Sequence, residues 1–166
     1  MLKWFKALAL ASAVGVLAAC ASSSDGPDDN IVETAQSDPR FSILVEAVVA
    51  ADLAETLSGD GPFTVFAPTN DAFAALLAEL GVTKDELLAN KPLLTQVLTY
   101  HVLDARVLKA EVPVGTPVTT LQGQTLRVTP ALAIEDQRGR SANIVATDVL
   151  TSNGVIHVLD RVILPQ

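Results

Sequence analysis

The fold of this chain is decided by a stretch of 13 residues, Gly61-Pro62-Phe63-Thr64-Val65-Phe66-Ala67-Pro68-Thr69-Asn70-Asp71-Ala72-Phe73. Between the two prolines, the aromatic and β-branched run Phe63–Ala67 predicts a short strand. Thr69 or Asn70 then supplies a cap for a helix that ends at Gly81. A strand followed at once by a capped helix predicts a domain that mixes both structures.

The residues on either side of this stretch, in the first half of the chain, predict further helices. Asn30 followed by Glu33 predicts an N-cap with an acidic residue in the first turn. A capping box at Thr83–Glu86 and a proline at position 92 predict two more helix starts. One amphipathic face is predicted from apolar residues at helical spacing, namely Phe41, Leu44, Val45, Val48 and Val49.

The second half of the chain predicts strands. The candidates are Tyr100–Leu103, Val118–Leu121, Thr125–Thr129, Ala131–Glu135, Asn143–Leu150 and Val155–Leu164. Asn153-Gly154 between apolar runs predicts a tight hairpin whose two turn residues have positive φ. Helices early and strands late indicate an α+β fold rather than alternating βαβ units.

Three segments together resemble fasciclin domains. Residues 61–73 resemble the first signature of that family, Leu98–Leu103 its central Tyr-His segment, and Ser152–Pro165 its closing signature. The resemblance covers residues 31–166. It implies a helical layer from the N-terminal half beside a twisted β-wedge from the C-terminal half. It also implies an adhesion or binding module with no enzymatic reaction common to the family.

The first 19 residues predict a lipoprotein signal peptide. Lys3 and Lys6 form a basic start, and the uncharged run Ala7–Ala19 has signal-peptide length and is too short to span a membrane. The run ends in Leu17-Ala18-Ala19-Cys20, which resembles the lipobox of bacterial lipoproteins. The alternative is an ordinary signal peptide with an incidental cysteine.

The lipobox resemblance implies that Cys20 is the lipidation site. Its sulfur receives a diacylglycerol, the chain is cut before it, and the new amino group is often acylated, for example with palmitate. Ala21 follows in place of an aspartate, which favours the outer membrane over the inner membrane. The remainder of residues 20–30 is rich in Ser, Asp, Gly and Pro, so we expect a flexible tether between the bilayer and the domain.

The candidate site residues are few. His101 and His157 are the only histidines, each in an apolar context, and we expect both to be buried and hydrogen-bonded. The alternative is a metal pair, which needs a third ligand from Asp or Glu. Asp71 stands in the first turn of a predicted helix, and as a catalytic carboxylate it lacks a second positioned group. Tyr100 and His101 form a candidate binding segment, because the matching segment of animal fasciclin domains has been linked to integrin binding, although we do not expect an integrin as the partner here. The alternative is that the repeating Leu and Val residues of this segment belong to the core.

The charge composition argues against one class of binding partner. The chain has 19 acidic and 11 basic residues, and 9 of the basic residues remain after cleavage, which argues against a nucleic acid partner. No catalytic, metal or cofactor site is expected. We expect a non-enzymatic, surface-tethered module of the cell envelope that binds an unidentified protein or polysaccharide. The alternative is a periplasmic or surface binding protein for a small or lipidic ligand, which requires a concave apolar pocket.

Overall fold

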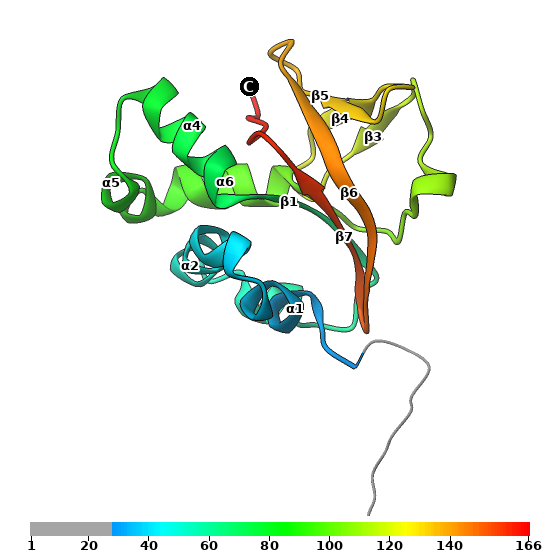
Figure 1. Cartoon of the computed structure of the whole chain (residues 1–166), viewed down its shortest axis with the longest axis horizontal. Coiled ribbons are helices and arrows are strands. Elements are labelled where there is room, and N and C mark those ends of the chain that lie inside the picture. The colour runs from blue at the N-terminus through cyan, green and yellow to red at the C-terminus, as the bar shows by residue number, and fades with distance from the viewer. Residues whose placement is uncertain (1–27) are drawn as a thin grey trace, which may run out of the picture.

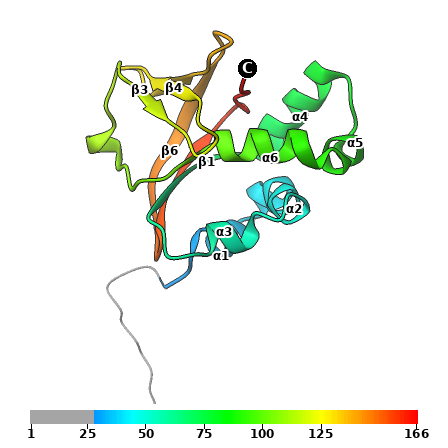
Figure 2. The same cartoon turned by 180° about the vertical axis from the view of Figure 1, so that it is seen from behind.

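Within residues 28–166, which the computed structural model describes, six α-helices form a layer beside a seven-stranded sheet (Figures 1 and 2). The predicted signal peptide, Cys20 and most of the predicted tether lie outside these residues. The elements in chain order are α1 (Ile31–Ser37), η1 (Pro39–Phe41), α2 (Ser42–Ala50), α3 (Ala54–Leu57), β1 (Phe63–Pro68), α4 (Asn70–Leu80), α5 (Lys84–Ala89), α6 (Lys91–Tyr100), β2 (Val102–Leu103), η2 (Lys109–Glu111), β3 (Pro117–Thr119), β4 (Thr125–Val128), β5 (Ala133–Glu135), β6 (Ser141–Thr151) and β7 (Gly154–Leu159).

The predicted helix caps are confirmed. Asn30 and Glu33 form a capping box at the start of α1, and Thr83 begins a second capping box at α5. Thr69 caps α4 by accepting a hydrogen bond from a backbone amide, and Gly81 ends that helix with a φ of 69°. Local sequence therefore decides where these three helices begin or end.

The strand order in the sheet is β2-β1-β7-β6-β5-β4-β3, and the α+β class is confirmed. Strand β1 comes from the helical half of the chain and pairs in parallel with β7, starting at Phe63 opposite Gly154. The sheet is therefore not built from the C-terminal half alone. Its far ends approach each other where the Leu121 amide donates to the Val102 carbonyl at 2.7 Å, which curls the sheet into a nearly closed wedge.

The core has two parts. One lies between the helices and the sheet, and the other fills the inside of the wedge around Phe66, Leu126 and Ile134. In α2 the buried side chains are Leu44, Ala47 and Val48, whereas Val49 is 55% exposed. Three of the five predicted face residues, Phe41, Leu44 and Val48, are therefore buried, whereas Val49 lies outside the core and Ala47 is buried in addition.

All six strands predicted in the second half of the chain differ from the observed ones at one or both ends, and two of these differences change the kind of structure. The segment at Tyr100 continues the helical spacing of α6, so only Val102–Leu103 is a strand. Strand β7 ends at Leu159, five residues earlier than predicted, and the chain continues as an irregular buried segment.

The predicted hairpin exists, but the predicted turn is wrong. Thr151 pairs with Gly154, so the two loop residues are Ser152 and Asn153, and neither Asn153 nor Gly154 has a positive φ. Glycine is needed at position 154 for a different reason. A Cβ there would lie 2.0 Å from the carbonyl oxygen of Phe63 on β1. The close parallel approach of two strands, and not the turn, requires this glycine.

Asn153 joins the hairpin tip to the helical layer. Its Oδ1 accepts from the Ile31 amide at 3.0 Å, and its Nδ2 donates to the Leu57 and Gly59 carbonyls at 2.7 and 2.8 Å. The neighbouring Ser152 amide donates to the Asp29 carbonyl at 2.9 Å. Asp29 and Asn30, assigned to the tether from sequence, are thus attached to the domain, and the chain enters it beside the hairpin tip.

Candidate functional site

The Tyr100 side chain lies inside the wedge and not on the surface. It is fully buried at the end of α6, and its hydroxyl donates to the Thr125 carbonyl of β4 at 3.0 Å. Burial raises the pKa of Tyr100, which further favours the protonated phenol that donates this hydrogen bond. This side chain links α6 to β4 and offers no exposed group to a partner.

His101 lies beside it and is also buried. Its Nδ1 donates to the Val97 carbonyl at 2.7 Å, and its Nε2 accepts from the Ile163 amide at 3.1 Å. Burial lowers the pKa of His101 to about 4, so the ring is neutral at pH 7. Both ring nitrogens are occupied, and the side chain attaches the irregular C-terminal segment to α6.

His157 is the second buried ring. Its Nε2 donates to the Val107 carbonyl at 2.8 Å, its Nδ1 accepts from the Asp148 amide at 3.3 Å, and it stacks on Phe66 at 5.6 Å. Asp148 has a φ of 57° at an irregularity of β6, so the ring supports a strained residue. Within residues 28–166 no group of three or more His, Cys, Asp or Glu side chains is placed to hold a metal.

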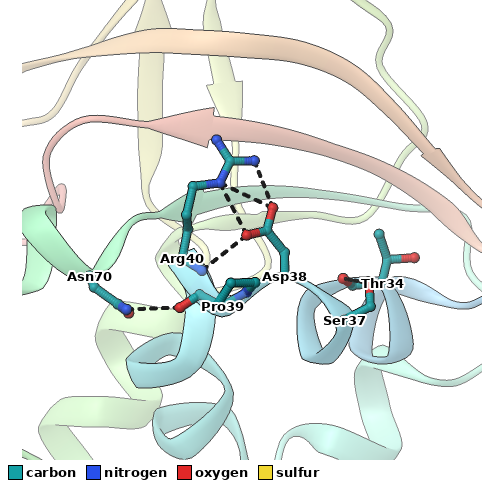
Figure 3. Close-up of polar contacts among 6 residues, drawn as sticks. All are labelled: Thr34, Ser37, Asp38, Pro39, Arg40 and Asn70. Carbon is teal, nitrogen blue, oxygen red and sulfur yellow. Dashed lines mark hydrogen bonds and ion pairs between the residues drawn. The ribbon is translucent and has the colours of Figure 1, made fainter.

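Asp71 borders an open hollow on the surface, beside Thr69 and Pro39. Its neighbour Asn70 does not cap its own helix. Asn70 donates to the Pro39 carbonyl at 3.0 Å (Figure 3). Its Oδ1 accepts a hydrogen bond from the Ile43 amide at 3.1 Å in the first turn of α2. Asn70 therefore joins the N-termini of α2 and α4, and this role explains an asparagine beside the Thr69 cap.

An exposed ion pair lies at the edge of the same hollow. The Arg40 guanidinium contacts the Asp38 carboxylate at 2.6 Å and holds the pKa of that carboxyl below its usual range (Figure 3). The Asp38 carboxylate also accepts from the Arg40 amide at 3.0 Å, which shapes the turn into η1. The pair organises a local turn, and it does not provide an acid and a base facing a common cavity.

A small apolar cavity lies between the helical layer and the strands β1 and β7. Its volume is about 30 Å³, and side chains such as Val48, Phe66 and Leu98 line it. That volume corresponds to about one water molecule. Ligand pockets usually measure roughly 300–1,000 Å³, so this cavity does not accommodate a lipid in this conformation.

The two halves of the described chain differ strongly in charge. Residues 28–103 carry 12 acidic and 3 basic side chains, and residues 104–166 carry six of each. All three cations of the first half are in ion pairs, namely Arg40–Asp38, Lys84–Glu46 and Lys91–Asp52. Cations without an ion-pair partner are thus found only in the second half of the described residues. A count of charges by half would have shown this asymmetry from the sequence.

This fold is the FAS1 fold. The structure superposes on a FAS1 domain pair from the insect cell adhesion molecule Fasciclin I with a TM-score of 0.74, covering 83% of this chain and 51% of that one. The sequence identity is 18%, so this similarity concerns the fold alone. Within the described residues no helix is both long enough and apolar enough to cross a membrane.

The chain belongs to the fasciclin family, whose Fasciclin domain pattern matches residues 39–165. Protein sll1483 of Synechocystis sp. is 49% identical over 138 residues, which cover 81% of this chain and 73% of that protein. Human periostin is 31% identical over 143 residues, which cover 83% of this chain and 16% of periostin. Fasciclin domains occur in adhesion proteins and are generally not enzymes.

Proposed function

We propose that this chain is a non-enzymatic adhesion module, tethered to the bacterial cell envelope by lipid on Cys20, that binds a protein or polysaccharide. The observation that carries the proposal is the fasciclin match over residues 39–165. The site geometry supports it, since Tyr100, His101 and His157 are all hydrogen-bonded to backbone groups in the core. Binding then depends on the surface of a rigid domain.

Adhesion is tested with beads coated with residues 21–166, a chain that keeps every described residue and omits the lipid. We expect these beads to bind cells of the producing bacterium at 0.15 M salt, and excess soluble chain to compete. The matched control is the same chain unfolded before coupling. Equal binding by folded and unfolded chains would contradict the proposal, because it would show that the folded surface is not what binds.

The proposed location is the outer membrane, with the domain held there by acylated Cys20. Two or three acyl chains anchor a protein far more firmly than one. The proposal on sorting depends on Ala21, and fractionation of cells tests it. We expect the wild-type chain in the outer membrane and the Ala21→Asp variant in the inner membrane. Finding both chains in one membrane would show that residue 21 does not sort this protein.

A further inference from the structure

A second hollow, of about 150 Å³, lies between the helices α4, α5 and α6 and the C-terminal segment. Its floor is apolar and is made by Leu76, Leu87, Val97 and Leu164, which are all buried. Leu80 also lines it and is 39% exposed, so an apolar side chain is accessible to solvent there. An apolar cavity of about 150 Å³ holds one benzene-sized group. This hollow therefore fits one large side chain of a partner and no larger ligand.

Arg138 also lines the hollow, from the turn between β5 and β6. The exposed guanidinium of Arg138 makes no ion pair within the described residues, whereas Arg140 in the same turn bonds to Glu79 at 2.8 Å. One wall of an apolar hollow thus carries a free positive charge.

A buried carboxylate holds this turn in place. Asp136 Oδ1 accepts from the amides of Arg138 and Arg140, both at 2.9 Å, and Oδ2 accepts from the Leu164 amide at 3.2 Å. The same side chain therefore fixes the backbone of Arg138 and the segment that forms part of the floor. Such preorganisation lowers the entropy cost of binding.

The hollow also lies at the end of the domain opposite the point where the chain enters it. Strand β6 runs from the turn at Arg138 to the hairpin tip, beside which the chain enters the domain (Figures 1 and 2). A domain anchored through its N-terminus presents this distal end to a partner most readily.

We infer that the hollow binds a peptide segment of a partner protein in which a leucine-sized side chain stands next to a carboxylate. The apolar side chain fills the hollow, and the carboxylate pairs with Arg138. The inference rests on the proposed adhesion function and narrows it, because an apolar hollow selects a protein over a polysaccharide. It serves as one anchor point of a larger contact.

The test uses the capped peptide acetyl-Gly-Glu-Leu-Glu-Gly-amide and backbone amide NMR of residues 21–166. Burial of one leucine side chain gives a dissociation constant of roughly 5–80 mM. We expect shifts at the amides of Gln96, Arg138 and Leu164, which line the hollow. Replacing the peptide leucine with alanine should weaken binding about 10-fold or more. Replacing both glutamates with glutamine should weaken it about 2- to 5-fold, as expected for an exposed ion pair.

Two variants test separately how much the Arg138 charge and the apolar hollow contribute to peptide binding. Arg138→Gln should remove the preference for glutamate over glutamine in the peptide, and Gln96→Trp should block the hollow and abolish binding of both peptides. The matched control is Lys109→Gln, which removes an exposed positive charge at the start of η2. The backbone amide of Lys109, which donates to Asp148, is unchanged. A thermal melt of each variant verifies folding. Absence of shifts in the wild-type chain, or an unchanged preference in Arg138→Gln, would overturn the inference.

The bead assay distinguishes this inference from the proposed function. If coated beads adhere to cells but the peptide does not bind, the assigned site is wrong and the adhesion function stands. If the peptide binds and the beads do not adhere, the adhesion function is wrong and the site remains a peptide site.

Discussion

The change Asn153→Asp replaces the side-chain NH2 group with an oxygen at the centre of the junction between the hairpin tip and the helices. One oxygen of the new carboxylate still accepts a hydrogen bond from the Ile31 amide, as Asn153 Oδ1 does at 3.0 Å in the wild-type chain. Its second oxygen, however, replaces the nitrogen that donates to the Leu57 and Gly59 carbonyls at 2.7 and 2.8 Å. Three oxygens that all accept hydrogen bonds then face one another in a nearly dry site.

The expected loss in the free energy of unfolding is about 3–5 kcal/mol at pH 7. Two hydrogen bonds contribute about 1 kcal/mol each, and a buried carbonyl left without a donor costs roughly 1–3 kcal/mol more. Burial between carbonyls raises the pKa of the new aspartate in the folded state. Its protonated form can donate to one carbonyl, so the deficit relative to the wild-type chain should shrink as the pH falls from 7 to about 4.

Urea unfolding of both chains at several pH values measures this deficit. The control is Asn90→Asp, since Asn90 caps α6 by accepting from the Leu93 amide at 3.3 Å, and aspartate caps a helix equally well. We expect the control to change stability by less than about 0.5 kcal/mol. A deficit for Asn153→Asp below about 1 kcal/mol at pH 7, or one that grows toward low pH, would refute the reasoning.

Three further outcomes are expected. Gly154→Ala should lower the unfolding free energy by about 3 kcal/mol in urea, because its Cβ would lie 2.0 Å from the Phe63 carbonyl oxygen, and a neutral result would contradict the strand approach. The unfolding free energy of the wild-type chain should fall by about 3 kcal/mol between pH 6.5 and 4, because the unfolded chain protonates His101 near pH 6.5 and the folded protein only near pH 4. In the His101→Gln variant, the unfolding free energy should change less over this pH range. Cys20→Ser should move the protein from the membrane to the soluble fraction, and detergent partitioning equal to the wild type would rule out lipidation.

Local sequence was sufficient for the elements whose ends are set by neighbouring residues. The capping boxes at Asn30 and Thr83 and the glycine at position 81 act within one helical turn, so they are legible in the sequence. The proline-bracketed strand β1 and the α+β class are legible for the same reason, because backbone preference and hydrophobic spacing are local properties. The fasciclin resemblance then supplied the architecture as a whole.

The tertiary structure alone decided the roles of the polar residues. The partners of Asn153 at Leu57 and Gly59 are 96 and 94 positions away, and His101 bonds to an amide 62 positions away. Sequence reasoning assigned Asn153 to a turn type, and it predicted a buried, hydrogen-bonded His101 without identifying its partners, because its evidence came from adjacent residues. The hollow at Arg138 is formed by five separate segments, so no local pattern marks it. A buried polar group must find a partner wherever the fold brings one, and that partner is set by the packing of the chain as a whole.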